Sequence, residues 1–210
     1  MKKFIKEACV GNLEEAIRAE AQGADRIELC TDLHLDGLTP SEELIKTAKE
    51  QLNIPIRVMI RPRSGDFLYT PEELKEIKAS IEFCKSTGVE AVVFGILNSK
   101  NELDIEKIEQ LTQFSAPLKV VVHKAIDFTN DPLENLEKLL KIKGISSVLT
   151  SGGAETAEEG KELLKKMLEL CGNGVEIVPA GKISCDNLEE LHEYLGARAY
   201  HGKRIVGDLH

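Results

Sequence analysis

The amino-acid sequence predicts an α/β fold: a single TIM-type (β/α)8 barrel over residues 1–210 with the eighth helix missing. Short apolar segments rich in β-branched residues alternate with amphipathic segments. One such pair recurs about every 30 residues, the length of a βα unit. Eight apolar and seven amphipathic segments are present. The alternative is a doubly wound sheet, but its commonest forms use only about five or six strands.

The apolar segments are the predicted strands, and they begin near Ile5, Arg26, Ile56, Ala91, Lys119, Ser147, Val175 and Ala199. Between them, segments such as residues 12–22 and 71–85 repeat apolar residues at helical spacing and are predicted as helices. The segments that enter the strands are short and contain glycine or proline, which is typical of helix ends.

The loops after the second and third strands, residues 31–41 and 62–73, are much longer than the other connections. Both leave the carboxyl ends of their strands, the face on which barrels bind ligands. Residues 61–69, RPRSGDFLY, carry two arginines, an aspartate and two aromatic residues. This loop is therefore predicted to belong to a ligand site.

Only the seven residues 204–210 follow Lys203 on the last predicted strand, so an eighth helix cannot form. The apolar seam between the last and first helices then lacks its usual cover. We expect a second subunit to cover it, which predicts a homodimer or a higher homo-oligomer with the last strand or first helix in the interface. The alternative is that the short tail folds back over the seam.

Composition and charge argue against several classes of partner. The formal net charge of the 210 residues is −9, which does not suit binding to a nucleic-acid backbone. No apolar run approaches the roughly 18 residues that a membrane span needs. The five cysteines form no CxxC pair and are odd in number, which argues against a disulfide framework. The sequence thus predicts a cytoplasmic protein with reduced thiols, without nucleic-acid or membrane partners.

Strand alternation assigns side chains to the barrel interior. Glu7, Glu28, Arg61 and His123 are predicted to point inward near the top, and Asp127 follows the same strand as His123. The carboxylates and His123 are candidates for acid-base catalysis. Two alternatives stay open: a purely structural ion network, and a core histidine with one hydrogen bond.

Cys9 and Cys30 stand two residues after Glu7 and Glu28, in matching places of two strands. Neighbouring strands run about 4.8 Å apart, so the two thiols can approach one another. A pair of thiolates favours Cu(I), which makes these cysteines candidate metal ligands. Buried cysteine is also a common packing residue, and that alternative remains.

The later strands end in small residues, within LTSGG, PAGKI and YHGKR. Exposed backbone N–H groups at such turns bind anions in barrels, and ordinary turn chemistry is the alternative. With the loop after the third strand, they predict a site for a small anionic ligand. The predicted ligand-binding residues are Arg61, Arg63, Asp66, Ser151, Gly152, Gly153, Gly181 and His201.

The sequence resembles the CutC family, which is named for copper homeostasis, over nearly its whole length. The resemblance rests on EACV, GADRIELC, GLTPS, MIRPRSGDFLY, VHKAID, LTSGG and PAGKI. It implies a TIM-like barrel in the cytosol, copper handling, Cu(I) bound by Cys9 and Cys30, and self-association. The chain departs from the family pattern at Asp36, Ser64, Lys124 and Lys182.

Two functions follow. The first is a copper homeostasis protein that holds Cu(I) between the barrel cysteines. The second is a barrel enzyme acting on a small phosphate- or carboxylate-bearing metabolite, bound by Arg61 and Arg63, with His123 or a carboxylate moving a proton. The resemblance favours the first function. The arginines around the mouth favour the second, because a thiol pair alone has no need of them.

Overall fold

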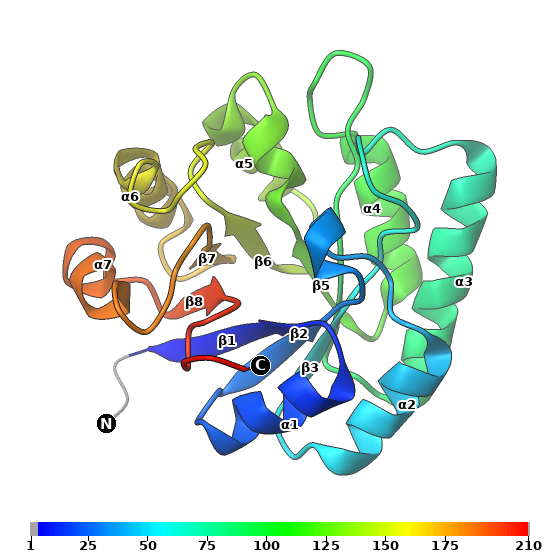
Figure 1. Cartoon of the computed structure of the whole chain (residues 1–210). Coiled ribbons are helices and arrows are strands. Elements are labelled where there is room, and N and C mark those ends of the chain that lie inside the picture. Colours follow the sequence, from blue (N-terminus) through cyan, green and yellow to red (C-terminus); the bar gives the residue numbers. More distant parts are fainter. Residues whose placement is uncertain (1–3, 210) are drawn as a thin grey trace.

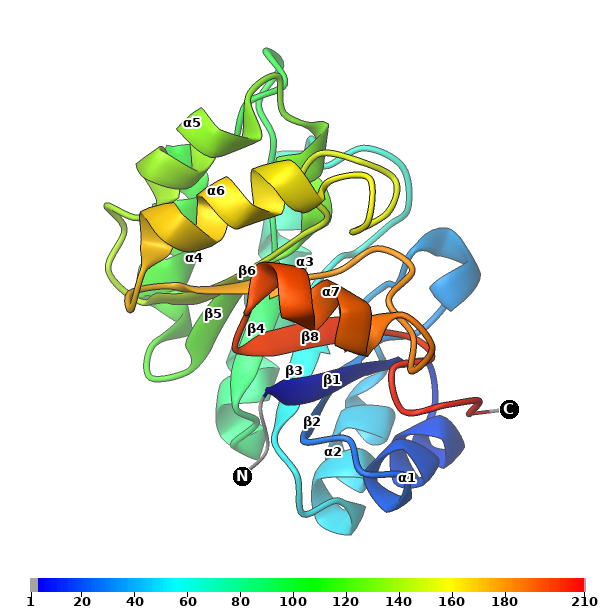
Figure 2. The same ribbon diagram turned by 90° about the vertical axis from the view of Figure 1, so that its left-hand side faces the viewer.

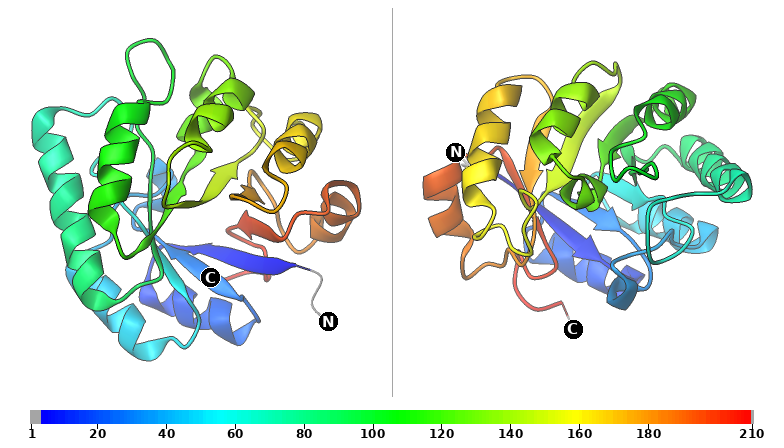
Figure 3. Two further views of the ribbon diagram at one scale, coloured as in Figure 1. Left: turned by 180° about the vertical axis from the view of Figure 1, so that it is seen from behind. Right: turned by 90° about the horizontal axis from the view of Figure 1, so that it is seen from above.

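The structure, a computed structural model, describes residues 4–209. Eight parallel strands form the inner wall and seven α-helices surround them, so the predicted barrel and its missing eighth helix are confirmed within these residues (Figures 1 and 3). The strands are β1 (Ile5–Val10), β2 (Arg26–Leu29), β3 (Ile56–Met59), β4 (Ala91–Phe94), β5 (Lys119–Val122), β6 (Ile145–Thr150), β7 (Glu176–Pro179) and β8 (Ala199–Gly202). The helices are α1 (Leu13–Ala21), α2 (Glu42–Gln51), α3 (Pro71–Thr87), α4 (Ile105–Ser115), α5 (Pro132–Leu139), α6 (Lys161–Cys171) and α7 (Leu188–Leu195), with 3-10 turns η1 (Leu33–Leu35) and η2 (Lys124–Phe128).

The strands are hydrogen-bonded in the order β7-β6-β5-β4-β3-β2-β1-β8. Closure between the two end strands occurs just beyond them, where Ser184 bridges Arg204 and the amide of Cys185 donates to the Arg204 carbonyl at 3.0 Å. A Cβ on Gly202 would lie 2.0 Å from the carbonyl oxygen of Ile183. Glycine at the end of β8 therefore lets the barrel wall come together.

Local signals in the sequence fix the helix ends. Thr70 caps α3, where its hydroxyl accepts from the amide of Glu73 and the Glu73 side chain accepts from the amide of Thr70. Pro71 occupies the first turn, and Gly88 ends the helix with φ 69°. Helix α3 thus begins directly behind the long loop after β3 and holds its far end.

The core has two parts that match the predicted strand alternation. Side chains such as Ile27 and Val58 pack outward against the helices. The inward side chains form a separate apolar cluster of mostly small residues, namely Cys9, Cys30, Met59, Ala91, Val93, Val121, Leu149, Val178, Ala180 and Ala199. Both cysteines therefore lie inside the barrel, as predicted.

The prediction of an uncovered seam is wrong, because the tail folds back against α1 (Figures 1 and 2). Arg18 donates to the carbonyl of Leu209 at 2.9 Å, and Gln22 donates to that of Asp208 at 3.1 Å. Ile205 and Leu209 are buried. The tail alternative named above is the one observed, so the missing helix no longer argues for an interface at this place.

Among residues 4–209, no helix is long and apolar enough to cross a membrane.

Candidate metal centre

A buried ion network lies at the amino-terminal half of the barrel and is anchored by Glu7 on β1. Arg26 on β2 donates to Glu7, and Arg57 on β3 lies 2.9 Å from it. Glu176 on β7 accepts from Arg26 at 2.8 Å. Burial opposes ionisation of Glu7, but the hydrogen bond from His201 and the two arginines outweigh it and hold the pKa of Glu7 well below its usual range.

Directly above this network, three donor groups meet, from β1, from β2 and from the residue that follows β2. The sulfur atoms of Cys9 and Cys30 lie 3.8 Å and 3.6 Å from Oε2 of Glu28. All three donor atoms lie within 4.8 Å of one another, and all three residues are buried. The pairing of Cys9 with Glu28 in the β1–β2 register produces this arrangement.

His201 on β8 joins the same group, because β8 places it in register with Glu7. Its Nδ1 lies 2.8 Å from Oε1 of Glu7, and its Nε2 lies 3.7 Å from Oε2 of Glu28. Glu7, Glu28 and His201 form a second set of donors within 4.8 Å. Glu28 belongs to both sets and links the thiols to the imidazole.

The two thiols of this centre have opposite pKa shifts. The hydrogen bond with Cys30 lowers the pKa of Cys9 well below its usual value, with help from His201 and against burial. The same hydrogen bond, together with burial, raises the pKa of Cys30. Cys9 therefore loses its proton more readily than Cys30.

Two further groups in the centre have displaced pKa values. Burial raises the pKa of Glu28 to about 8, despite the nearby His201. Burial opposes a charge on His201, but Glu28, Cys9 and Glu7 raise its pKa well above the usual value.

Arg61 and His123, which were predicted to share this interior, make a different set of contacts at the barrel mouth. Arg61 donates to the carbonyls of Leu35 and Gly65 at 2.9 Å and 3.0 Å, and it stacks 4.9 Å from the centre of the Phe67 ring. The His123 ring lies 4.9 Å from the same ring. The predicted polar interior is thus two groups: Glu7, Glu28 and His201 with the cysteines, and Arg61 with His123.

Arg63 and Asp66 lie on the outer side of the same loop. Arg63 donates to Asp66 at 2.9 Å and to Glu73 on α3, and 37% of its side chain is exposed. Unlike Arg61, Arg63 already has two carboxylate partners.

The turn after β6, predicted to bind an anion, already binds a carboxylate of the chain. Asp127 accepts from the amides of Ser151 and Gly153 at 2.9 Å each, and the amide of Gly152 donates to the hydroxyl of Thr150. Lys124 lies 2.9 Å from Asp127. These amides therefore have internal acceptors.

Gly181, the remaining predicted turn residue, packs against this turn. A Cβ on it would meet that of Ser151 at 2.9 Å.

Sequence reasoning missed the arginines of the ion network, Arg26 and Arg57. Both have the inward parity of Glu28 and Met59, which was the available signal. His201 was expected near an anion site and instead contacts the two glutamates.

The chain also resembles known proteins. The model of the CutC family matches residues 4–206. The chain belongs to the CutC family. A relative from Homo sapiens, the copper homeostasis protein cutC homolog, is 41% identical over 198 residues, covering 94% of this chain and 72% of that one.

Solved structures also resemble this chain. The CutC structure from Streptococcus agalactiae superposes with a TM-score of 0.91 at 32% identity and covers 96% of this chain and 99% of that one. A Rubisco-like protein from Rhodopseudomonas palustris reaches a TM-score of 0.66 at 14% identity, covering 94% of this chain and 59% of that one. The second likeness concerns the barrel fold alone. The resemblance read from the sequence motifs is thereby confirmed.

Proposed function

We propose that this CutC protein serves copper homeostasis by binding Cu(I) as cargo through Cys9 and Cys30. The observation that carries the proposal is the convergence of both thiols on one carboxylate inside the barrel, with all three donor atoms within 4.8 Å. The relative from Homo sapiens is named for copper homeostasis, which supports the same function.

The donor set fits Cu(I). Thiolates are soft ligands that select this ion, and two of them suffice to hold it. The lowered pKa of Cys9 helps this residue to bind as the thiolate. Cys30 must lose its proton when it binds a metal, and its sulfur lies 3.6 Å from Oε2 of Glu28.

Glu28 and His201 lie beside the thiols, and we do not assign them as ligands of the soft ion. His201 is fixed by its hydrogen bond to Glu7, which the arginines hold in turn. We assign His201 and Glu28 the role of positioning residues that keep the thiols at their place and balance charge when the ion enters.

A cytoplasmic location agrees with this chemistry. The five cysteines are free thiols, and both Cu(I) and unpaired thiols belong to a reducing compartment. We therefore keep the cytoplasm as the proposed location.

The test is competition for Cu(I) against a chromophoric chelator under anaerobic, reducing conditions. The double variant Cys9→Ser, Cys30→Ser should lose tight binding. The matched control is Cys84→Ser, since Cys84 is also a buried free thiol but lies on α3, outside the barrel. Unchanged affinity in the double variant, with its circular dichroism intact, refutes the proposal.

A further inference from the structure

Arg61 differs from the two other buried arginines. Arg26 and Arg57 each pair with Glu7 and Glu176. Within the part of the chain that the structure describes, Arg61 has no carboxylate partner, although the residue is only 4% exposed. A buried guanidinium without a counter-ion is costly, so its retention calls for an anion from outside the chain.

The surroundings of Arg61 hold it in place without using all of its donors. Its backbone amide donates to the hydroxyl of Thr39 at 2.8 Å, and the amide of Thr39 donates back to the Arg61 carbonyl at 3.0 Å. The two terminal nitrogens of the guanidinium donate to carbonyls of Leu35, Gly37 and Gly65. Nε alone has no acceptor among the described residues.

His123 presents a second unused donor beside it. Nδ1 of His123 accepts from the amide of Ala125 at 3.1 Å, so the proton of a neutral ring lies on Nε2, which is buried without a partner in the described chain. Burial, with Arg61 nearby, holds the pKa of His123 at about 3, so the ring is neutral. A Cβ on Gly95 would lie 2.7 Å from the ring, which shows that His123 packs against the backbone just after β4.

Phe67 joins the two groups, since its ring contacts both the Arg61 guanidinium and the His123 imidazole at 4.9 Å. Buried polar atoms without a partner gather at this end of the barrel. At the mouth they are Arg61 Nε, Tyr69 Oη and His123 Nε2, whereas Glu28 Oε1 belongs to the centre beside the cysteines. Arg57 Nη1 also lacks a hydrogen bond but lies 2.9 Å from Glu7 as an ion pair. Such a cluster of unmet donors needs an explanation, and a ligand supplies one.

We propose that the barrel mouth over β3 to β5 binds a small oxyanion, the carboxylate or phosphate group of a metabolite, through Arg61 Nε–H and His123 Nε2–H beneath Phe67. This site uses residues other than the cysteines and adds a ligand to the copper function. Arg61 supplies the counter-charge, and neutral His123 supplies a hydrogen bond. Tyr69, on the same loop, offers a third donor.

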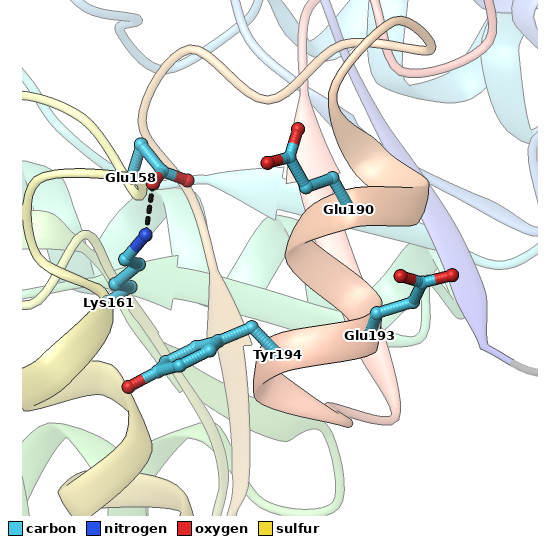
Figure 4. A pocket seen from close by; sticks show the side chains of 5 residues that line it. All are labelled: Glu158, Lys161, Glu190, Glu193 and Tyr194. Carbon is cyan, nitrogen blue, oxygen red and sulfur yellow. Dashed lines mark hydrogen bonds and ion pairs between the residues drawn. The ribbon is translucent and has the colours of Figure 1, made fainter.

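The open groove between α6 and α7 is not a competing anion site. Glu158, Lys161, Glu190, Glu193 and Tyr194 line this groove of about 330 Å³ (Figure 4). Its one lysine is paired with Glu158, and the other charges are carboxylates that repel an anion.

The test follows the arginine Nε–H and histidine Nε2–H signals of the whole protein by ¹H–¹⁵N NMR during titration with inorganic phosphate and, separately, with pyruvate. The Arg61 and His123 signals should shift together with at least one of the two. Phosphate alone would assign the phosphate class, and pyruvate alone the carboxylate class. If neither ligand moves either signal, the proposal is overturned.

Variants test the same site by affinity. Arg61→Gln should weaken binding of the responding anion by roughly ten- to a hundredfold, the loss of one charge-assisted hydrogen bond. Arg63→Gln is the matched control on the same loop and should bind normally. Equal weakening by both variants would mean general surface charge and would refute the site.

Two further variants cover folding and the copper site. If Arg61→Gln does not fold, His123→Asn, which can still accept from the Ala125 amide, replaces it and should also weaken binding. Cys9→Ser, Cys30→Ser should retain anion binding, which keeps this test independent of copper.

Discussion

Oε2 of Glu28 lies 3.6 Å from the sulfur of Cys30, and the same oxygen lies 3.7 Å from Nε2 of His201. One carboxylate therefore connects a proposed metal ligand to an imidazole on the other side of β1. Because Glu28 is the leading attraction that opposes the effect of burial on His201, the two residues titrate together.

We predict that Glu28→Gln lowers the pKa of His201 toward its usual range, since the variant removes the negative charge that Glu28 carries above its own pKa of about 8 but keeps the side-chain volume. Histidine ring ¹⁵N chemical shifts followed over a pH series measure this directly. His192 is the internal control, because it contacts Phe4 and Tyr200 instead. An unchanged His201 midpoint would contradict the coupling.

Glu7 provides a prediction on stability. Glu7→Gln leaves Arg26 and Arg57 buried with one counter-charge fewer, and breaking a buried pair in this way costs about 3–5 kcal/mol. Urea denaturation at neutral pH measures the loss. The surface variant Glu14→Gln, which breaks the exposed pair with Arg18, should cost less than about 1 kcal/mol.

Glu7 also affects how the free energy of unfolding changes at acidic pH. The pKa of Glu7 is lower in the folded chain than in the unfolded chain, so its contribution is complete above the unfolded pKa of about 4.5 and is lost as pH falls below it. Glu7→Gln should therefore lose less stability between pH 5 and pH 3 than the parent protein. Parallel losses in the two proteins would disagree with an ionised Glu7 in the network.

The interior direction of these residues was predictable, whereas their partners were not. Strand alternation alone places Glu7, Cys9, Glu28 and Cys30 inward. It does not give the register between strands, which sets Glu7 opposite Arg26 and His201 and so defines the two donor sets.

Loop conformation was also beyond the local pattern. Asp127 reaches the turn after β6 from η2, a contact between residues more than 20 positions apart, and it occupies the amides predicted for a ligand. Arg61 and Arg63 look equivalent in the sequence, but backbone geometry turns one inward and the other outward. The long loop itself was correctly placed, because its position follows from the strand ends.

His123 also makes stability depend on pH, but as a buried base rather than a buried acid. Its pKa is about 3 in the folded chain and 6.5 in the unfolded chain, so between these values the unfolded chain binds the extra proton and folding weakens as pH falls. From pH 7 to pH 5 this amounts to about 2 kcal/mol.

His123→Asn should flatten that part of the pH profile, because asparagine does not titrate there. Urea midpoints of both proteins at pH 7 and pH 5 provide the measurement. His34→Asn, at an exposed position on η1, is the control and should keep the parent slope. If His123→Asn keeps the parent slope as well, His123 is not buried in its neutral form.

Assembly remains a prediction, and the tail changes where its interface should lie. Ile205 and Leu209 already cover the seam beside α1, so this surface needs no partner. Ile17 on α1 nevertheless keeps 41% of its surface exposed, and the first helix was one of the two elements predicted for the interface, with the last strand. Removing a large apolar side chain from water contributes about 1.5–3 kcal/mol, and pairing two α1 helices around a two-fold axis buries two copies of it.

We therefore predict a homodimer or larger oligomer by light scattering at micromolar concentration, and a lower mass for Ile17→Glu. The Glu14→Gln variant, which alters the same helix without adding a buried charge, serves as the control and should retain the parent mass. A parent mass near one chain of 23.2 kDa would rule out self-association. A parent oligomer that Ile17→Glu leaves intact would keep the assembly but move its interface away from α1, toward another apolar surface such as Phe128 at the barrel mouth, which is 64% exposed.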